Sequence, residues 1–152
     1  MMRTLEPNEC ERLLKSRYHG HLACTADGKP YLVPVSYVWT PKGIVGYTHE
    51  GKKIDMMRAN PHVWLQVEDI TDRAWRSVVV YGTYNELSGT EKTTAIDALG
   101  QFVANAKISP PFVREDMIAA VHPPAPAKHP VIYRIEIDEV TGRAFGELSD
   151  LS

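Results

Sequence analysis

Apolar and polar residues alternate along several short stretches of the chain, and this pattern predicts β-strands. In the clearest stretch, 62–68, the apolar residues Val63, Leu65 and Val67 fall on one face. The dipeptide Asp27-Gly28 between two other stretches is typical of a hairpin turn. Strands are predicted at 19–25, 30–39, 44–48, 62–68, 75–87, 131–137 and, after a turn at 138–141, 142–147.

A spacing of three and four between apolar residues predicts helices elsewhere. Residues 7–16 place Cys10, Leu13 and Leu14 on one face, and Pro7 suits a first helical turn. A short helix is expected after the strand 44–48, and Pro61 should stop it. Two more helices are predicted at 90–106 and 112–121, followed by an irregular proline-rich connector at 122–130.

Because hairpin-linked strands outnumber helices, the predicted fold class is mostly β: an antiparallel, closed or partly closed barrel with helices outside it. Pro34 cannot donate a hydrogen bond within its strand, so it marks an edge, a bulge or a departure from the sheet. Gly82 marks a bulge or a close approach. A doubly wound parallel sheet is disfavoured because strands and helices do not alternate strictly. The 152 residues predict a single domain, 1–152.

The composition is that of an ordinary globular protein, with 43% hydrophobic and 24% charged residues. The formal net charge of −2 argues against a general nucleic-acid or membrane-surface binder, which would carry a basic excess. The two cysteines form no C-x-x-C pair, and no signal peptide or membrane-spanning stretch is visible. A cytoplasmic location is therefore expected.

Lys52 and Lys53 stand in the first turn of the short helix, where the helix dipole favours acidic side chains. Two ammonium groups, the free N–H groups of a helix start and the nearby Gly51 together suit a phosphate. The alternative is a pair of solvated surface lysines. The segment is not a P-loop, because it lacks the first glycine and the Ser or Thr after the lysine.

Arg76 and Ser77 begin an otherwise apolar strand and should point to opposite faces. Both side chains can bind phosphate, although Arg76 can equally pair with an acidic neighbour. His19 and His21 share a strand face, but no third ligand is apparent, so no metal site is predicted. Neither a G-x-S-x-G elbow nor a Ser/His/Asp grouping is present.

Three segments, in this order and spacing, carry a resemblance to a known family. They are 20–37 (GHLACTADGKPYLVPVSY), 47–61 (YTHEGKKIDMMRANP) and 75–82 (WRSVVVYG). The chain resembles the pyridoxamine 5′-phosphate oxidase-like, FMN-binding split-barrel proteins from about Leu5 to Gly146, and among them most the nitroimidazole-resistance proteins. The resemblance implies a split β-barrel, and a homodimer with FMN in a groove between subunits.

The resemblance also implies a set of cofactor contacts. The FMN phosphate would sit on Lys53 and Lys52, and the residues Arg76 and Ser77 would add phosphate or ribityl contacts. The flavin ring would lie along the backbone of three strand residues with two more close by; these five are Val35, Ser36, Tyr37, Thr48 and His49. His49 matches the position of a histidine that matters in the nitroimidazole-resistance group, so it is the candidate catalytic residue.

The expected function is FMN-dependent reduction of a small flat electron acceptor, such as a nitroaromatic or a quinone, with NAD(P)H as a possible electron donor. Pyridoxine phosphate oxidation is disfavoured, because residues 143–152 lack the substrate-binding Arg/Trp-containing tail of the true oxidase. Two alternatives remain open. The same fold would accept haem or a deazaflavin, or the protein would bind a flavin without catalysis.

Overall fold

The computed structural model describes residues 1–105 and 130–147, and within them the protein is mostly β. The helices are α1 (Pro7–Ser16), α2 (Lys52–Ala59) and α3 (Gly89–Asn105). The strands are β1 (Met2–Thr4), β2 (His19–Ala26), β3 (Lys29–Ser36), β4 (Val38–Thr40), β5 (Gly43–His49), β6 (His62–Ile70), β7 (Trp75–Glu86) and β8 (Pro130–Phe145). The helix expected at 112–121 and the connector expected at 122–130 lie outside the described residues, apart from Pro130.

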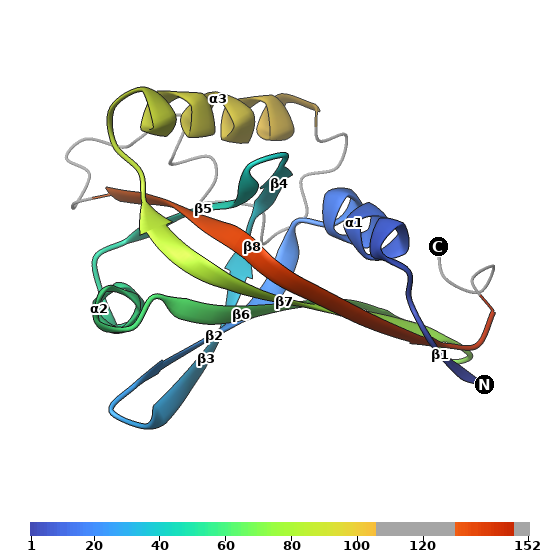
Figure 1. Ribbon diagram of the computed structural model, residues 1–152. Coiled ribbons are helices and arrows are strands. Elements are labelled where there is room, and N and C mark those ends of the chain that lie inside the picture. The colour runs from blue at the N-terminus through green and yellow to red at the C-terminus, as the bar shows by residue number, and fades with distance from the viewer. Residues whose placement is uncertain (106–129, 148–152) are drawn as a thin grey trace.

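All eight strands form one antiparallel sheet in the order β3-β2-β6-β7-β8-β5-β4, with β1 added to β8. The sheet curls into a split barrel; α1 packs against its concave side, and α3 lies across the outer side of β5 and β8 (Figure 1). The predicted fold class is confirmed. β3 and β4 are the two end strands, so the proline Pro34 lies in an edge strand.

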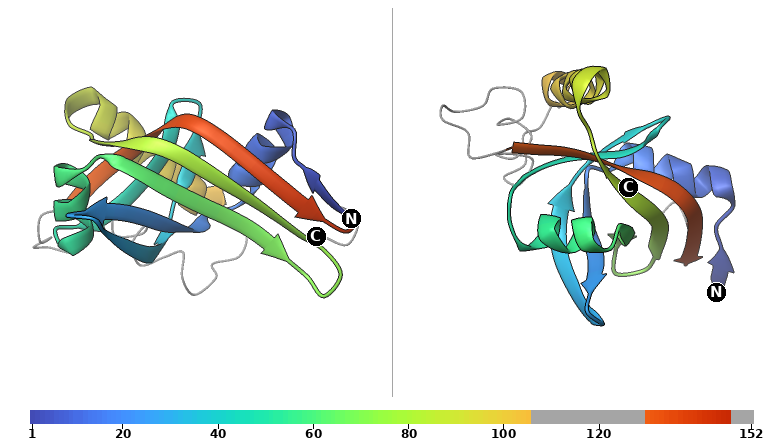
Figure 2. Two further views of the ribbon diagram at one scale, coloured as in Figure 1. Left: turned by 60° about the horizontal axis from the view of Figure 1, so that its bottom comes forward. Right: turned by 60° about the vertical axis from the view of Figure 1, so that its left-hand side comes forward.

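Two groups of buried side chains hold the fold together. The main core fills the curl of the sheet and takes in the predicted apolar face of α1 together with Val63, Leu65 and Val67. A second, smaller core lies between α3 and the outer side of β5 and β8, and includes Val45, Leu99 and Ile132. α2 lies beside the β2–β3 hairpin at one end of the barrel (Figure 2).

The predicted strand 30–39 is interrupted at Tyr37. This residue leaves the sheet because its N–H donates to the carbonyl of Tyr18 at 2.8 Å and its hydroxyl donates to the carbonyl of Leu14 at 2.8 Å. Both contacts draw Tyr37 into the core beneath α1, where its side chain is fully buried. The chain therefore forms two strands, β3 and β4, where one was predicted.

The predicted turn at 138–141 is wrong, because β8 runs unbroken from Pro130 to Phe145 and pairs with β7 from Tyr133 to Phe145. The turn-like residue Asp138 forms a bulge instead: Tyr81 pairs with Glu139 and Gly82 with Ile137. Asp138 is held there by the Thr83 hydroxyl at 2.7 Å. The register shift falls beside Gly82, as predicted, where a Cβ atom would approach the Glu136 carbonyl oxygen to 2.4 Å.

Candidate cofactor-binding site

The start of α2 combines two lysines with an uncapped helix end. Lys52 and Lys53 are its first two residues, and the N-cap residue Gly51 provides no side-chain hydrogen bond. The first N–H groups of a helix have no partner within the helix, and they carry its partial positive charge. The predicted juxtaposition of ammonium groups and a bare helix N-terminus is therefore present.

Both lysines are associated with the β2–β3 hairpin. The Lys52 Nζ atom lies over the ring of Tyr31, 4.7 Å from its centroid. Lys53 is half-buried, and its charge acts on the buried thiol of Cys24. Burial raises the pKa of that thiol, and the nearby ammonium group opposes the rise. Tyr31 and Cys24 are paired residues of β3 and β2, so the two ammonium groups flank this hairpin.

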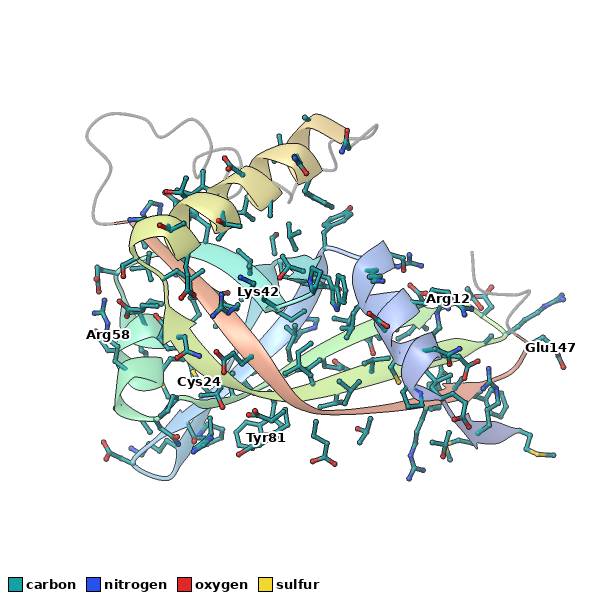
Figure 3. All side chains as sticks on the ribbon, turned by 45° about the horizontal axis from the view of Figure 1, so that its top comes forward. Arg12, Cys24, Lys42, Arg58, Tyr81 and Glu147 are labelled. Atoms are coloured by element: carbon teal, nitrogen blue, oxygen red, sulfur yellow. The ribbon has the colours of Figure 1, made fainter. Side chains whose placement is uncertain are left out.

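Arg58, in the last turn of α2, braces the loop that leads to the lysines. Its guanidinium donates to both carboxylate oxygens of Glu50 at 2.7 Å, and it also bonds Glu86 at the end of β7. Glu86 in turn accepts the Tyr84 hydroxyl at 2.9 Å. These contacts tie the β5–α2 loop to β7, and Figure 3 shows Arg58 on the outer side of α2.

The three residues predicted to lie along the flavin ring differ in their surroundings. Val35 is in the main core and Ser36 is half-buried, both in the edge strand β3. An edge strand leaves backbone groups without a strand partner on one side, which suits a planar hydrogen-bonding ligand. The N–H and the hydroxyl of Tyr37 both donate hydrogen bonds within the fold. Its carbonyl takes part in neither of these two bonds.

Thr48 and His49 lie at the end of β5, three and two residues before Gly51. Successive strand residues point to opposite faces. The exposed His49 packs edge-on against Tyr47, with ring centroids 5.4 Å apart, on the side of the second core. The half-buried Thr48 therefore points toward the main core. The two side chains lie near the lysines along the chain but do not face the same way.

Arg76 and Ser77 lie at the other end of the barrel. They pair with Asp69 and Glu68 of β6, and Glu68 lies six positions along the strand from His62, the β6 residue nearest α2 in the sequence. This is roughly 20 Å at the usual rise of a strand. Within one chain, Arg76 and Ser77 are therefore not brought to the lysines.

The side chains of Arg76 and Ser77 point to opposite faces, as predicted. Arg76 donates to Asp69 at 2.7 Å, and the same carboxylate binds Arg17. The acidic-neighbour alternative is thus what the structure contains. Ser77, on the outer face of the sheet, accepts a hydrogen bond from Gln66 at 3.1 Å.

Two contributors to the site, Tyr31 and Arg58, were not predicted from the sequence. The hairpin signal at Asp27-Gly28 contained the information for Tyr31, because that register sets Tyr31 opposite Cys24. Arg58 had no comparable signal, since Glu86 lies 28 residues away along the chain.

Among residues 1–105 and 130–147, no helix is both long and apolar enough to cross a bilayer. Within that same part of the chain, no three His, Cys, Asp or Glu side chains gather as a metal site would require.

Two comparisons show close similarity to known proteins. The uncharacterized protein RA0666 of Rhizobium meliloti is 30% identical over 151 residues, which cover 94% of this chain and 95% of the relative. The crystal structure of an FAD-binding protein from Mesorhizobium loti is 33% identical with a TM-score of 0.77, and the match covers 97% of this chain and 98% of that one.

More distant structures share the fold. A candidate 5-nitroimidazole antibiotic resistance protein from Bacteroides thetaiotaomicron has a TM-score of 0.73 at 18% identity, with 96% and 90% of the chains covered. The haem storage protein HutZ from Vibrio cholerae has a TM-score of 0.65 at 12% identity, with 92% and 93% covered. The model of the pyridoxamine 5′-phosphate oxidase family matches residues 6–144, nearly all of the sequence that builds the barrel. The chain therefore belongs to the pyridoxamine 5′-phosphate oxidase-like family, whose fold is a flavin-binding split barrel.

Proposed function

We propose that the protein is a flavin-dependent oxidoreductase that binds FMN with its phosphate on the N-terminus of α2. The observation that carries this proposal is the uncapped start of α2, where Lys52 and Lys53 are the first two residues. Without an anion, these charges oppose the helix dipole, whereas a phosphate would interact favourably with both. The residues present therefore fit the phosphate of a flavin nucleotide.

The proposed site is completed by a second copy of the chain. Beyond the part that α3 covers, the outer face of the sheet carries large apolar side chains from β1, β3, β6 and β8. The strand register puts five exposed ones on this face: Met2, Leu32, Trp64, Ile70 and Phe145. An uncovered apolar face of this extent is typical of a protein–protein interface. A homodimer through this face, which also carries Ser77, would place that residue of one subunit near the cofactor of the other.

The proposed mechanism assigns one role to the cofactor and one to each group of residues. The bound flavin supplies two-electron redox chemistry. Lys52 and Lys53 hold the phosphate, and the edge strand β3, through Val35 and Ser36, orients the ring. His49 is exposed at the end of β5, two residues before Gly51, and we assign to it the exchange of a proton with a substrate. The proposed substrate is a flat electron acceptor, such as a nitroaromatic or a quinone, with NAD(P)H as the electron donor.

We propose FMN rather than the other cofactors because the start of α2, with its two lysines, suits a phosphate group. The Mesorhizobium loti relative is described as FAD-binding, and FAD presents a diphosphate to the same lysines. HutZ is described as a haem storage protein, but haem carries carboxylates and needs an axial ligand. A deazaflavin nucleotide would share the phosphate and differ in the ring.

The absorption spectrum of the purified protein separates these cofactors. We expect flavin bands, and stoichiometric uptake of FMN by protein that has been stripped of cofactor. Lys53→Ala should weaken FMN binding by about tenfold or more, the size of one charge-assisted contact. Lys92→Ala, a lysine of α3, is the matched control. A Soret band, or a colourless protein that takes up no flavin, would overturn the proposal.

Turnover separates an enzyme from a flavin-binding protein. With FMN bound and a nitroaromatic or quinone acceptor present, we expect NAD(P)H oxidation faster than that catalysed by free FMN. His49→Ala should lower the rate while FMN stays bound. A rate equal to that of free FMN would leave flavin binding intact and contradict the enzymatic part of the proposal.

A further inference from the structure

A cavity separate from the lysine site lies between α3, β4 and the C-terminal end of α1. Its volume is about 610 Å³, which is within the range of small-molecule sites. It touches α3 from Thr90 to Asn105, so it is elongated, extending roughly 22 Å along the helix at 1.5 Å per residue. Neither Lys52 nor Lys53 is among the residues that line it.

The long walls of this cavity are mostly apolar, although polar side chains of α3 also line it. Val38 and Val45 line it from the strands, and Ala98 and Phe102 line it from α3. Trp39 contributes its ring, and the Lys15 Nζ atom lies 4.4 Å from that ring's centroid. Such walls suit a hydrocarbon or aromatic body and do not suit a sugar or a nucleotide.

One end of the cavity is polar and basic. Arg134 lies there against Gly43, because a Cβ atom added to Gly43 would approach the Arg134 Cγ atom to 3.2 Å. The neighbouring Lys42 also lines the cavity. The Arg134 side chain is only 15% exposed and pairs with Glu91 at 3.0 Å. Its Nε atom is buried and has no hydrogen-bond partner among the described residues. A buried N–H group without an acceptor is costly, so a small shift of the guanidinium that let a ligand accept from this atom would be favourable.

The charges favour an anion over a neutral molecule. Four cationic residues line the cavity, namely Lys15, Arg17, Lys42 and Arg134, against the single carboxylate of Glu91. Lys15 and Arg17 are paired outside it, with Glu11 and Asp69, and Glu136 approaches Arg134 at 3.6 Å. Lys42 forms no ion pair within residues 1–105 and 130–147. Because Glu91 would repel a multiply charged group, the ligand should carry one negative charge.

We propose that this cavity is a second binding site, which takes a monocarboxylic acid with an elongated apolar body. The carboxylate accepts hydrogen bonds from Arg134 and Lys42, and the apolar body lies between α3 and β4. The residues of this site differ from those of the proposed flavin site, so an experiment can refute one proposal and leave the other standing.

Titration calorimetry with decanoate on the full chain tests this proposal. We expect saturable binding to one site per chain, with decan-1-ol about tenfold weaker because it lacks the charge. The fluorescence of Trp39 should change on binding, and the change should be lost in Trp39→Phe. Lys53→Ala should bind decanoate as the wild type does. An absence of saturable binding, or equal affinity for the alcohol, would overturn the proposal.

Two matched pairs of variants locate the ligand. Ala98→Phe fills the cavity and should weaken decanoate binding by about tenfold or more, whereas Ala104→Phe, on an exposed position of the same helix, should not. Lys42→Glu should weaken binding, whereas Lys29→Glu, the same charge change at the start of β3, should not. Lys42 is exposed, so this second pair does not depend on tolerance of a larger side chain. Equal behaviour within each pair would contradict the assignment.

Discussion

Arg58 links the position of the two lysines to the rest of the barrel. It has no place among the proposed cofactor contacts, but it holds Glu50, which precedes Gly51 and Lys52, and it also bonds Glu86. A bidentate guanidinium–carboxylate pair fixes direction as well as distance. The loop that carries the lysines is therefore oriented by a side chain on the opposite end of their own helix.

Replacement of Arg58 should accordingly affect the cofactor indirectly. Arg58→Ala is expected to weaken FMN binding several-fold, because the start of α2 is no longer held against β7. Fluorescence titration of FMN measures this effect, and Arg12→Ala, an exposed arginine of α1, serves as the control. Restoration of affinity by Arg58→Lys would contradict the bidentate role, since lysine cannot form the fork.

The same contacts make the free energy of unfolding depend on pH. The hydrogen bond from Arg58 lowers the pKa of Glu86 in the folded protein, with a smaller contribution from Tyr84 and opposition from burial. A carboxylate with a lowered folded-state pKa stabilises the fold above its unfolded pKa of about 4.3, and loses that contribution as the pH falls through the folded value.

Glu86→Gln should therefore reduce the acid sensitivity of the fold. We expect the difference in unfolding free energy between wild type and variant to be present at neutral pH, and to shrink as the pH falls below about 4.3. Denaturant unfolding at a series of pH values measures it. Because Glu86 is partly exposed, added salt should also diminish the difference. A difference that is constant with pH would exclude this role.

At the scale of elements, Tyr37 joins three parts of the fold. Its hydroxyl bonds the last turns of α1, its N–H bonds the segment between α1 and β2, and it separates β3 from β4. Burial raises the pKa of this hydroxyl, which is consistent with a neutral structural group. Its contribution is therefore to the junction of elements, although it stands within the stretch predicted to line the flavin.

Tyr37→Phe is expected to lower the free energy of unfolding by about 1 kcal/mol, the usual value for a lost buried hydrogen bond. Flavin affinity should change little, because the backbone of Val35 and Ser36 remains in place. Thermal or denaturant unfolding and FMN titration together check both parts. A large loss of flavin affinity with unchanged stability would instead assign the hydroxyl to the cofactor.

The elements that could be predicted are those marked by residues within their own segment of the sequence. The bounds of α1 agree with the prediction because Pro7, the apolar spacing and the charges all mark the same segment. The continuous strand β8 could not be predicted, because Asp138 and Glu139 resemble a turn and only pairing with β7 reveals the bulge. The start of α2 was visible because the charge pattern of Lys52 and Lys53 is local.

The remaining parts of the site depend on contacts between distant segments. The stacking of Lys52 on Tyr31 and the bracing by Arg58 require the barrel to close before they exist. The pairing of Arg76 with Asp69 was one of two interpretations of the sequence, and only the β6–β7 register distinguishes them. Sequence patterns thus located the lysine pair at the start of α2, and tertiary structure determined which side chains support it.

At the scale of the whole molecule, the part of the outer sheet face that α3 does not cover is the surface through which we propose that two copies associate. Trp64 and Tyr81 pack together at its centre, with ring centroids 5.4 Å apart. Tyr81 lies on the side of the barrel away from α3 (Figure 3). If two copies associate through this face, burial of Trp64 contributes to both the dimer and the cofactor groove.

Trp64→Glu is expected to convert a dimer to a monomer, because it places two charges in an apolar interface. Sedimentation velocity measures the change, and Ala104→Glu on the exposed side of α3 is the control. Flavin affinity should fall together with dimerisation. A wild-type protein that is monomeric at all concentrations would contradict the subunit arrangement.

The central claim is that the start of α2 binds the phosphate of the cofactor, and a comparison of FMN with riboflavin tests it most directly. Riboflavin has the same ring without the phosphate. In fluorescence titrations the wild type should bind FMN much more tightly than riboflavin, and a Lys52→Ala/Lys53→Ala double variant should lose most of that preference while its affinity for riboflavin stays nearly unchanged. Equal losses for both ligands, or a preference that survives the double substitution, would contradict the account.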